Sequence, residues 1–204
     1  MDFAHARRSF EAACLLAVRN EKGWDGFELT SEGFFKSFSA LPLVIPLNIM
    51  FDLFAVRLAE ARASADGGPV SHGSYAFGEA LFSTAVLGVE WLIFPLVAAL
   101  LVWFLGIQSR FVPFKVSHNW GRVVTELLNL PAIVLFSMGL ISHQIAMDLL
   151  FITLGLTLYY RFYIAQSALG VSWGLAIAVS VLELLVTILF SVVIYRGASL
   201  WLPV

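Results

Sequence analysis

The chain has 204 residues, of which 60% are hydrophobic and only 13% are charged, and its mean hydropathy is +0.88. Because a soluble domain carries about 25% charged residues, this chain cannot cover a water-exposed surface and belongs in a lipid bilayer. The formal net charge of −2 and the lack of a basic run exclude a nucleic-acid partner, and a single cysteine, Cys14, excludes an internal disulfide and a Cys-based metal site.

Residues 1–36 form the first predicted region, which precedes the membrane domain. Acidic residues recur through 1–33 without a clean apolar core, which argues against a secretory signal peptide. The stretch 1–20 is predicted to be an amphipathic cytoplasmic helix. Two interpretations fit this helix: it packs on the bundle, or it lies on lipid headgroups. Its apolar face is expected to carry Phe3, Phe10, Cys14, Ala17 and Val18.

Five apolar segments follow, each long enough to cross about 30 Å of hydrocarbon, which takes about 20 helical residues. Because backbone amides in lipid must be bonded internally, these segments are predicted to be helices. The expected fold class is therefore all-α, a polytopic transmembrane bundle of five spans that occupies 37–204. In chain order the predicted spans are 37–57, 79–107, 123–141, 145–164 and 173–195.

The connections between the spans predict an orientation. The linker 61–75 is rich in Gly and Ser, and only three residues, 142–144, join the third span to the fourth. Cytoplasmic loops carry an excess of Lys and Arg, and nine of the twelve basic residues fall on the side of the N-terminus. A cytoplasmic N-terminus and a periplasmic C-terminus are therefore expected. The nine are Arg7, Arg8, Arg19, Lys22, Lys36, then Arg110, Lys115 and Arg122 in the predicted loop 108–122, and Arg161 at the end of the fourth span.

Polar residues form a stripe on the second span and another on the fifth. Their spacing of three and four residues places each stripe on one face of its helix. A charged side chain at the bilayer centre costs about 2.5–3.5 kcal/mol on insertion scales, so both stripes are expected to face the bundle interior. The stripes are Glu79, Ser83, Val86 and Glu90, and Ser172, Ala176, Ser180, Glu183, Thr187 and Ser191. The candidate intramembrane polar site consists of Glu90, Glu183, Ser180, Thr187 and Ser83.

Three interpretations of this polar site remain open. The stripes can serve close helix packing, in which small and hydroxyl side chains bond across an interface. They can hold a cation or proton, because intramembrane acids often mark ion pathways. They can also form a docking face for another membrane subunit. Glu90 and Glu183 are predicted to lie close in depth, because each is about eleven or twelve residues from the outer end of its span. No basic residue is expected at that depth, so at least one of the two carboxyl groups is predicted to be protonated.

The sequence holds no recognisable catalytic or nucleotide-binding motif. No His-x-x-x-His, Gly-x-Ser-x-Gly or P-loop pattern occurs. We therefore predict no catalytic residue, no cofactor and no metal site, and expect a non-enzymatic protein that binds or scaffolds other membrane components. The alternative is a small transporter or an ion-coupled membrane subunit that uses the intramembrane carboxylates.

Two stretches are similar to a known family. "FELTSEGFFKSFSALPL" at 27–43 resembles the lead into the first span of bacterial members of the Yip family, and "FKVSHNWGRVVTELLNLPA" at 114–132 resembles the start of their third span. The order of an N-terminal region and five spans resembles this family too. The Asp-Leu-Tyr-Gly-Pro element of eukaryotic members is absent, which argues against a Rab GTPase partner. The resemblance implies an integral protein of a bacterial inner membrane with a non-enzymatic role, and it assigns no site residue.

Overall fold

The computed structural model describes the backbone of residues 2–65 and 77–199 and the side chains of 2–64 and 81–194. Within these ranges every regular element is helical, so the predicted all-α class is confirmed. Seven α-helices alternate with three short 3₁₀ helices. They are α1 (Phe3–Ala17), η1 (Glu21–Gly26), α2 (Ser31–Ser37), η2 (Phe38–Ala40), α3 (Leu41–Ala65), α4 (Phe77–Phe104), η3 (Gln108–Arg110), α5 (Phe111–Ser137), α6 (His143–Leu169) and α7 (Trp173–Ser199).

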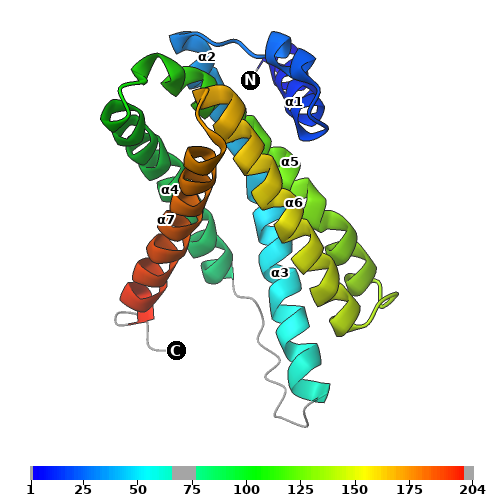
Figure 1. Cartoon of the computed structure of the whole chain (residues 1–204). Coiled ribbons are helices and arrows are strands. Elements are labelled where there is room, and N and C mark those ends of the chain that lie inside the picture. Colours follow the sequence, from blue (N-terminus) through cyan, green and yellow to red (C-terminus); the bar gives the residue numbers. More distant parts are fainter. Residues whose placement is uncertain (1, 66–76, 200–204) are drawn as a thin grey trace.

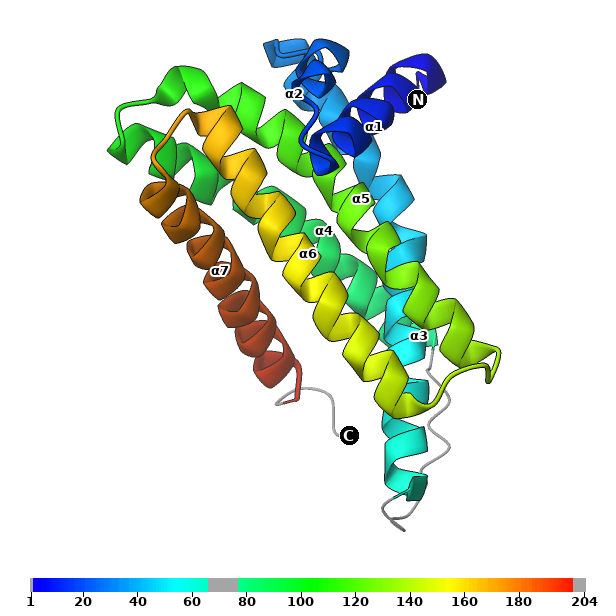
Figure 2. The same cartoon turned by 45° about the vertical axis from the view of Figure 1, so that its right-hand side comes forward.

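The five long helices, α3 to α7, run in alternating directions along the molecule (Figure 1). The short elements α1, η1 and α2 gather at one end, which we call the N-terminal end, together with the α4–α5 and α6–α7 connections (Figure 2). The α5–α6 connection lies at the opposite, far end. Gly170 ends α6 with a φ of 67° and allows the chain to turn sharply into α7.

Among the described residues, four helical segments are long and apolar enough to cross a membrane: Ser31–Ser64, Leu81–Phe104, His143–Leu169 and Trp173–Ile194. The chain is therefore a multi-span helical membrane protein. The outward face of α4 fits this assignment, since Leu92, Leu96 and Leu100 recur every fourth residue and are each about 65% exposed. The predicted count of five spans is not confirmed. The expected third span falls on α5, which is not apolar enough to count among the membrane-crossing segments.

Helix α5 is the most enclosed helix of the bundle. All of its residues from Phe114 to Gly121 are buried, and Trp120 is fully buried. It packs closely against α6, where a Cβ atom on Gly121 would lie 2.8 Å from Ile164 Cδ1. The segment 108–122 is therefore mostly a buried helix, and its prediction as a cytoplasmic loop is wrong. The charged residues of α5 lower its mean hydropathy, and their side chains point inward among the other helices.

Helix α1 packs on the N-terminal half of α5 and also contacts α6. The buried face of α1 carries the small residues Ser9, Ala12 and Ala13 together with Leu16. The Tyr160 hydroxyl of α6 donates a hydrogen bond of 2.7 Å to the Ala13 carbonyl. The expected apolar face makes part of this contact, since Phe10, Cys14 and Ala17 pack against the core, whereas Phe3 and Val18 are exposed. Small side chains prevail because they let the two helix backbones approach closely.

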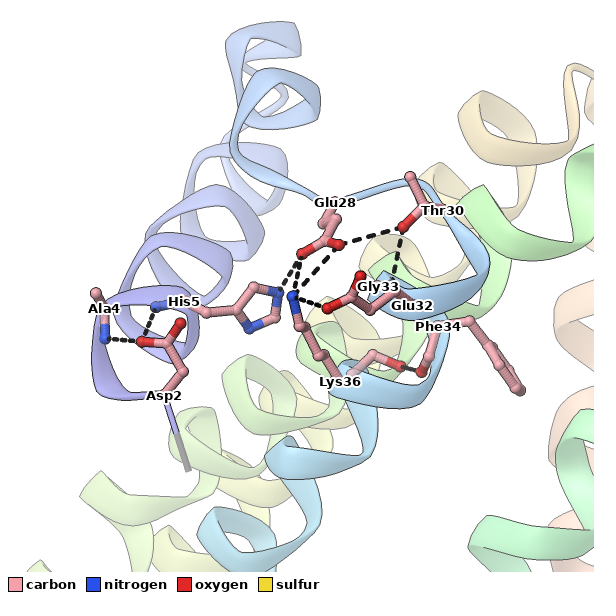
Figure 3. Close-up of polar contacts among 10 residues, drawn as sticks. Asp2, Ala4, His5, Glu28, Thr30, Glu32, Gly33, Phe34 and Lys36 are labelled. Carbon is pink, nitrogen blue, oxygen red and sulfur yellow. Dashed lines mark hydrogen bonds and ion pairs between the residues drawn. The ribbon is translucent and has the colours of Figure 1, made fainter.

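An ion-pair cluster links α1 to α2 (Figure 3). Lys36 donates to Glu28 at 3.1 Å and approaches Glu32 at 2.7 Å, and His5 Nε2 of α1 lies 3.7 Å from Glu28. The hydrogen bond from Lys36 lowers the pKa of the Glu28 carboxyl group. Glu28 is thus a negative centre held between His5 of α1 and Lys36 of α2.

Candidate polar site between the five long helices

A polar cleft of about 520 Å³ lies between the long helices, and each of the five contributes to its lining. Asp52 comes from α3, Glu90 from α4, Arg122 and Glu126 from α5, and Arg161 from α6; Thr187 and Ser191 of α7 complete it. Hydroxyl and amide side chains fill most of the remaining wall. Because polar groups inside a membrane protein are costly unless they have partners, the contacts of each charged residue decide what the cleft can bind.

Glu90 joins three helices. Arg122 of α5 donates from Nη2 to Glu90 Oε2 at 3.2 Å, and the Thr187 hydroxyl of α7 donates to Oε1 at 3.2 Å. The guanidinium of Arg122 also stacks over the neighbouring Trp91, with Cζ 5.4 Å from the ring centroid. This ion pair therefore compensates the carboxylate that interrupts the apolar run of α4.

Glu183 of α7 is held by two other residues. Its Oε1 atom accepts a hydrogen bond of 2.6 Å from His118 Nε2 and lies 3.0 Å from Arg161 Nη1. Glu183 is only 5% exposed, so this carboxylate depends on these two donors rather than on water. Arg161 reaches it from α6 and lines the cleft at the same time.

His118 connects Glu183 to a buried ammonium group. Its Nδ1 atom lies 3.3 Å from Lys115 Nζ, while its ring stacks on Phe94 of α4 at a centroid distance of 4.4 Å. Lys115 is 1% exposed, and its Nζ atom lies 4.4 Å from the same Phe94 ring. A neutral imidazole with its proton on Nε2 satisfies both neighbours, because Nε2–H donates to the carboxylate and Nδ1 accepts from the ammonium.

At the other side of the cleft, α3 and α4 share a small hydrogen-bond network. Asn48 donates to Asp52 at 3.1 Å and to the Ser83 hydroxyl at 2.8 Å, and Ser83 in turn donates to Asp52. Glu126 differs from these residues, since it forms no hydrogen bond or ion pair with any residue that the structure describes. Within the same ranges, no three His, Cys, Asp or Glu side chains gather as a ligand set for a metal ion.

The five residues of the sequence-derived site occupy three different environments. Glu90 and Thr187 contact each other, and Glu183 lies one helical turn before Thr187 on α7. Ser83 joins Asp52 of α3, and Ser180 donates to the Ala176 carbonyl of its own helix. Glu79 lies outside the residues whose side chains are described.

The expectation that no base lies at the depth of the acids is wrong. Arg122 pairs with Glu90, and Arg161 pairs with Glu183, so each carboxylate has a cation of its own. The reason for expecting a shared proton, repulsion between two uncompensated acids, is therefore absent. The arginines had been placed in a loop and at a span end, whereas α5 begins at Phe111 and α6 extends to Leu169.

Sequence reasoning missed the polar residues of α5, although a signal for them exists. Residues 115, 118, 122, 126 and 129 are Lys, His, Arg, Glu and Asn, and they are separated by three, four, four and three positions. This spacing is the same helical-face signal that identified the stripes of the second and fifth spans. The positive charges among these residues are also typical of a cytoplasmic loop, and they favoured that interpretation over a helix.

Comparisons with known proteins leave the family open. No protein-family model, curated protein or solved structure matches this chain, so the resemblance to the Yip family has no support beyond the two stretches that carry it. The length and hydropathy of its helices identify the chain as a multi-span helical membrane protein.

Proposed function

We propose that this membrane protein binds a small cation in the polar cleft and carries it across the bilayer. The observation that supports the proposal is the charge of the cleft and its immediate neighbours. Four carboxylates, those of Asp52, Glu90, Glu126 and Glu183, stand against the guanidiniums of Arg122 and Arg161 and the ammonium of Lys115. The formal sum is one negative charge, and Glu126 is an acid of the cleft that forms no hydrogen bond or ion pair with a described residue.

The chemistry of the lining favours a monovalent cation or a primary ammonium ion. Carboxylate, hydroxyl and amide oxygens are ligands for hard cations, and they also accept hydrogen bonds from an ammonium group. A single positive charge would bring the cleft close to neutrality, which reduces the cost of holding charge inside the bilayer. A divalent ion would leave an excess of positive charge beside the two arginines.

Binding of Na⁺, K⁺ and methylammonium to the purified protein, and their uptake into liposomes that contain it, tests this function. Glu126→Gln should lower affinity for the bound probe at least tenfold while leaving the fold intact, because the change removes the uncompensated charge. Asp148→Asn is the matched control, since Asp148 is an exposed acid on α6 that lies outside the cleft and accepts a hydrogen bond from Gln144. A wild-type protein that binds none of the three probes would contradict the proposal.

A second candidate function is the binding or scaffolding of another membrane component. It is supported by a groove of about 790 Å³ between α3 and α5 at the far end, with Phe54, Ile133 and Phe136 in its lining. Apolar residues line part of this groove, and Arg57 and Glu60 also line it, so it fits a transmembrane helix of a partner that carries a polar residue near its end. Purification in a mild detergent distinguishes the two functions, because a scaffold should retain a stoichiometric partner and lose it when Ile133 is changed to Trp.

We further propose a bacterial inner-membrane location with the N-terminal end in the cytoplasm. Although Lys115 is buried and Arg122 and Arg161 form ion pairs inside the bundle, so that none of the three counts as a loop charge, the charge bias persists. The N-terminal end still holds Arg7, Arg8, Arg19, Lys22, Lys36 and Arg110, whereas Arg57 and Arg62 lie towards the far end of α3. Arg196 lies outside the residues whose side chains are described.

A further inference from the structure

We propose that Lys115, His118 and Glu183 form a proton relay that controls the charge of the cleft through Arg161. The proposed cation-binding function is needed for the effect of the relay on cargo, but not for the relay itself. The three side chains come from two helices and form a continuous chain of contacts, 3.3 Å from Lys115 Nζ to His118 Nδ1 and 2.6 Å from His118 Nε2 to Glu183 Oε1.

The surroundings of this chain suit proton transfer. All three residues are at most 5% exposed, and Phe94 covers both the ammonium and the imidazole ring. Water therefore has little access to the donors, and the three side chains offer the proton a hydrogen-bonded route. The charged groups nearest to His118 are Lys115 and Arg122 on its own helix, Glu90 of α4, Arg161 of α6 and Glu183 of α7.

The transfer step balances within these three residues. Lys115 Nζ gives a proton to His118 Nδ1, and His118 gives its Nε2 proton to Glu183 Oε1. The imidazole stays neutral and changes tautomer, while the lysine becomes an amine and the glutamate a carboxylic acid. A hydronium ion from water then restores the Lys115 ammonium, so the net result is one proton moved from water to Glu183.

Protonation of Glu183 changes the cleft because Arg161 loses the negative charge that lies 3.0 Å from its guanidinium. Arg161 lines the cleft, so its positive charge, no longer paired with a Glu183 carboxylate, acts on a cation bound there. The cleft gains one unit of positive charge and repels its cargo. Cation binding and proton binding therefore oppose each other, which is the coupling that a proton-driven exchanger needs.

His118→Gln is a sharp test, because glutamine keeps a donor for Glu183 and an acceptor for Lys115 but cannot pass a proton through its side chain. The full chain in nanodiscs is taken from neutral to acidic pH, and the infrared C=O band of protonated carboxyl groups is followed in time. The wild-type protein should gain a band that Glu183→Gln lacks, and in His118→Gln this band should rise at least tenfold more slowly. Equal rates in the wild-type protein and His118→Gln would overturn the relay.

A second measurement needs no variant to fold. The ring nitrogen signals of ¹⁵N-labelled histidine in the wild-type protein should show His118 protonated on Nε2 at neutral pH and on Nδ1 in part after acidification. A ring protonated on both nitrogens would overturn the relay, because His118 would then hold the proton instead of passing it on.

A measurement of cation binding distinguishes a failure of the relay from a failure of the proposed cation-binding function. Affinity of the wild-type protein for the bound probe among Na⁺, K⁺ and methylammonium should fall at least tenfold on acidification. If the infrared and nitrogen signals appear and no cation binds, the relay stands and the proposed function fails. If a cation binds and neither signal appears, the function stands and the relay fails.

Discussion

Arg122 illustrates how one residue can hold a membrane bundle together. Its Nη2 atom bonds Glu90, its guanidinium plane covers Trp91, and its position on α5 places it beside both α4 and the cleft. The Nε atom of Arg122 is buried without a hydrogen-bond partner among the described residues. An ion pair in such surroundings stabilises the fold less than its Coulomb energy implies, yet the loss of either partner leaves an uncompensated charge.

We therefore predict that the Glu90–Arg122 pair is strongly coupled. Glu90→Gln alone should lower the free energy of unfolding by about 3 kcal/mol, because the Arg122 guanidinium then stays buried without a counter-charge. The double variant Glu90→Gln/Arg122→Gln should recover part of this loss. The coupling energy follows from a double-mutant cycle of unfolding in mixed micelles. A coupling energy of zero would show that the pair is unimportant for the fold.

At the same scale, Glu28 makes the docking of α1 sensitive to acid. Lys36 holds the pKa of the Glu28 carboxyl group below its ordinary value of 4.5. Because the folded pKa is the lower one, the contribution of Glu28 to stability is complete above pH 4.5 and is lost as the pH falls through the folded value. Protection factors of the α1 amides, that is exchange rates corrected for the intrinsic rate at each pH, should therefore fall at acidic pH. In Glu28→Gln these protection factors should already be low at neutral pH and should lose this part of their pH dependence.

Among the elements, α7 shows a clear division between an inner and an outer face. Ala176 and Ser180 are buried, whereas Val181 and Leu185 on the opposite face are about half exposed. The sequence predicted this division, because small and polar residues recur along one face of an otherwise apolar helix. The inner face also carries Glu183, whose partners on α5 and α6 fix the rotation of α7 about its own axis.

Ala176→Leu should therefore disrupt the packing of α7, because a bulky side chain at a fully buried position forces the helix away from its neighbours. We expect a lower yield of folded, monodisperse protein in size-exclusion chromatography in detergent. Val181→Leu is the matched control and should behave like the wild-type protein, since Val181 is 48% exposed. The same loss of yield in both variants would show that the inner face of α7 is not a packing surface.

Helix α5 marks the limit of what the sequence predicted. The apolar helices α3, α4, α6 and α7, and the part of α5 from residue 123 onwards, were predicted because hydropathy alone identifies a segment that faces lipid. Helix α5 contacts other helices over most of its surface, so its residue types suit contacts with protein rather than with lipid. Its Lys115 and Arg122 are stabilised by Glu183 and Glu90, which lie 68 and 32 positions away in the chain, respectively. Residues close to Lys115 and Arg122 in the sequence do not reveal these partners. Only the spacing of the polar residues along α5 indicates that they share a face of a helix.

For the whole molecule, the number of membrane crossings depends on α5. The long helices alternate in direction, and α5 runs from the N-terminal end to the far end as α3 and α7 do (Figure 1). If all five cross the bilayer, the two ends of the chain lie on opposite sides. If α5 does not cross, the four segments with sufficient hydropathy return the chain to the side on which it began.

We predict five crossings with a cytoplasmic N-terminal end, because the charges of α5 are compensated inside the bundle and need not reach water. Alkaline phosphatase, which is active only outside the cytoplasm, should be active when fused after Gly139 or Val204 and inactive when fused after Ile107 or Gly170. The fusions after Ile107 and Gly139 flank α5 and so test its crossing directly. Equal activity in these two fusions would show that α5 does not cross the bilayer. A full reversal of the four results would show that there are five crossings with the opposite orientation. The paired fusions thus separate the architecture of the bundle from the direction in which it is inserted.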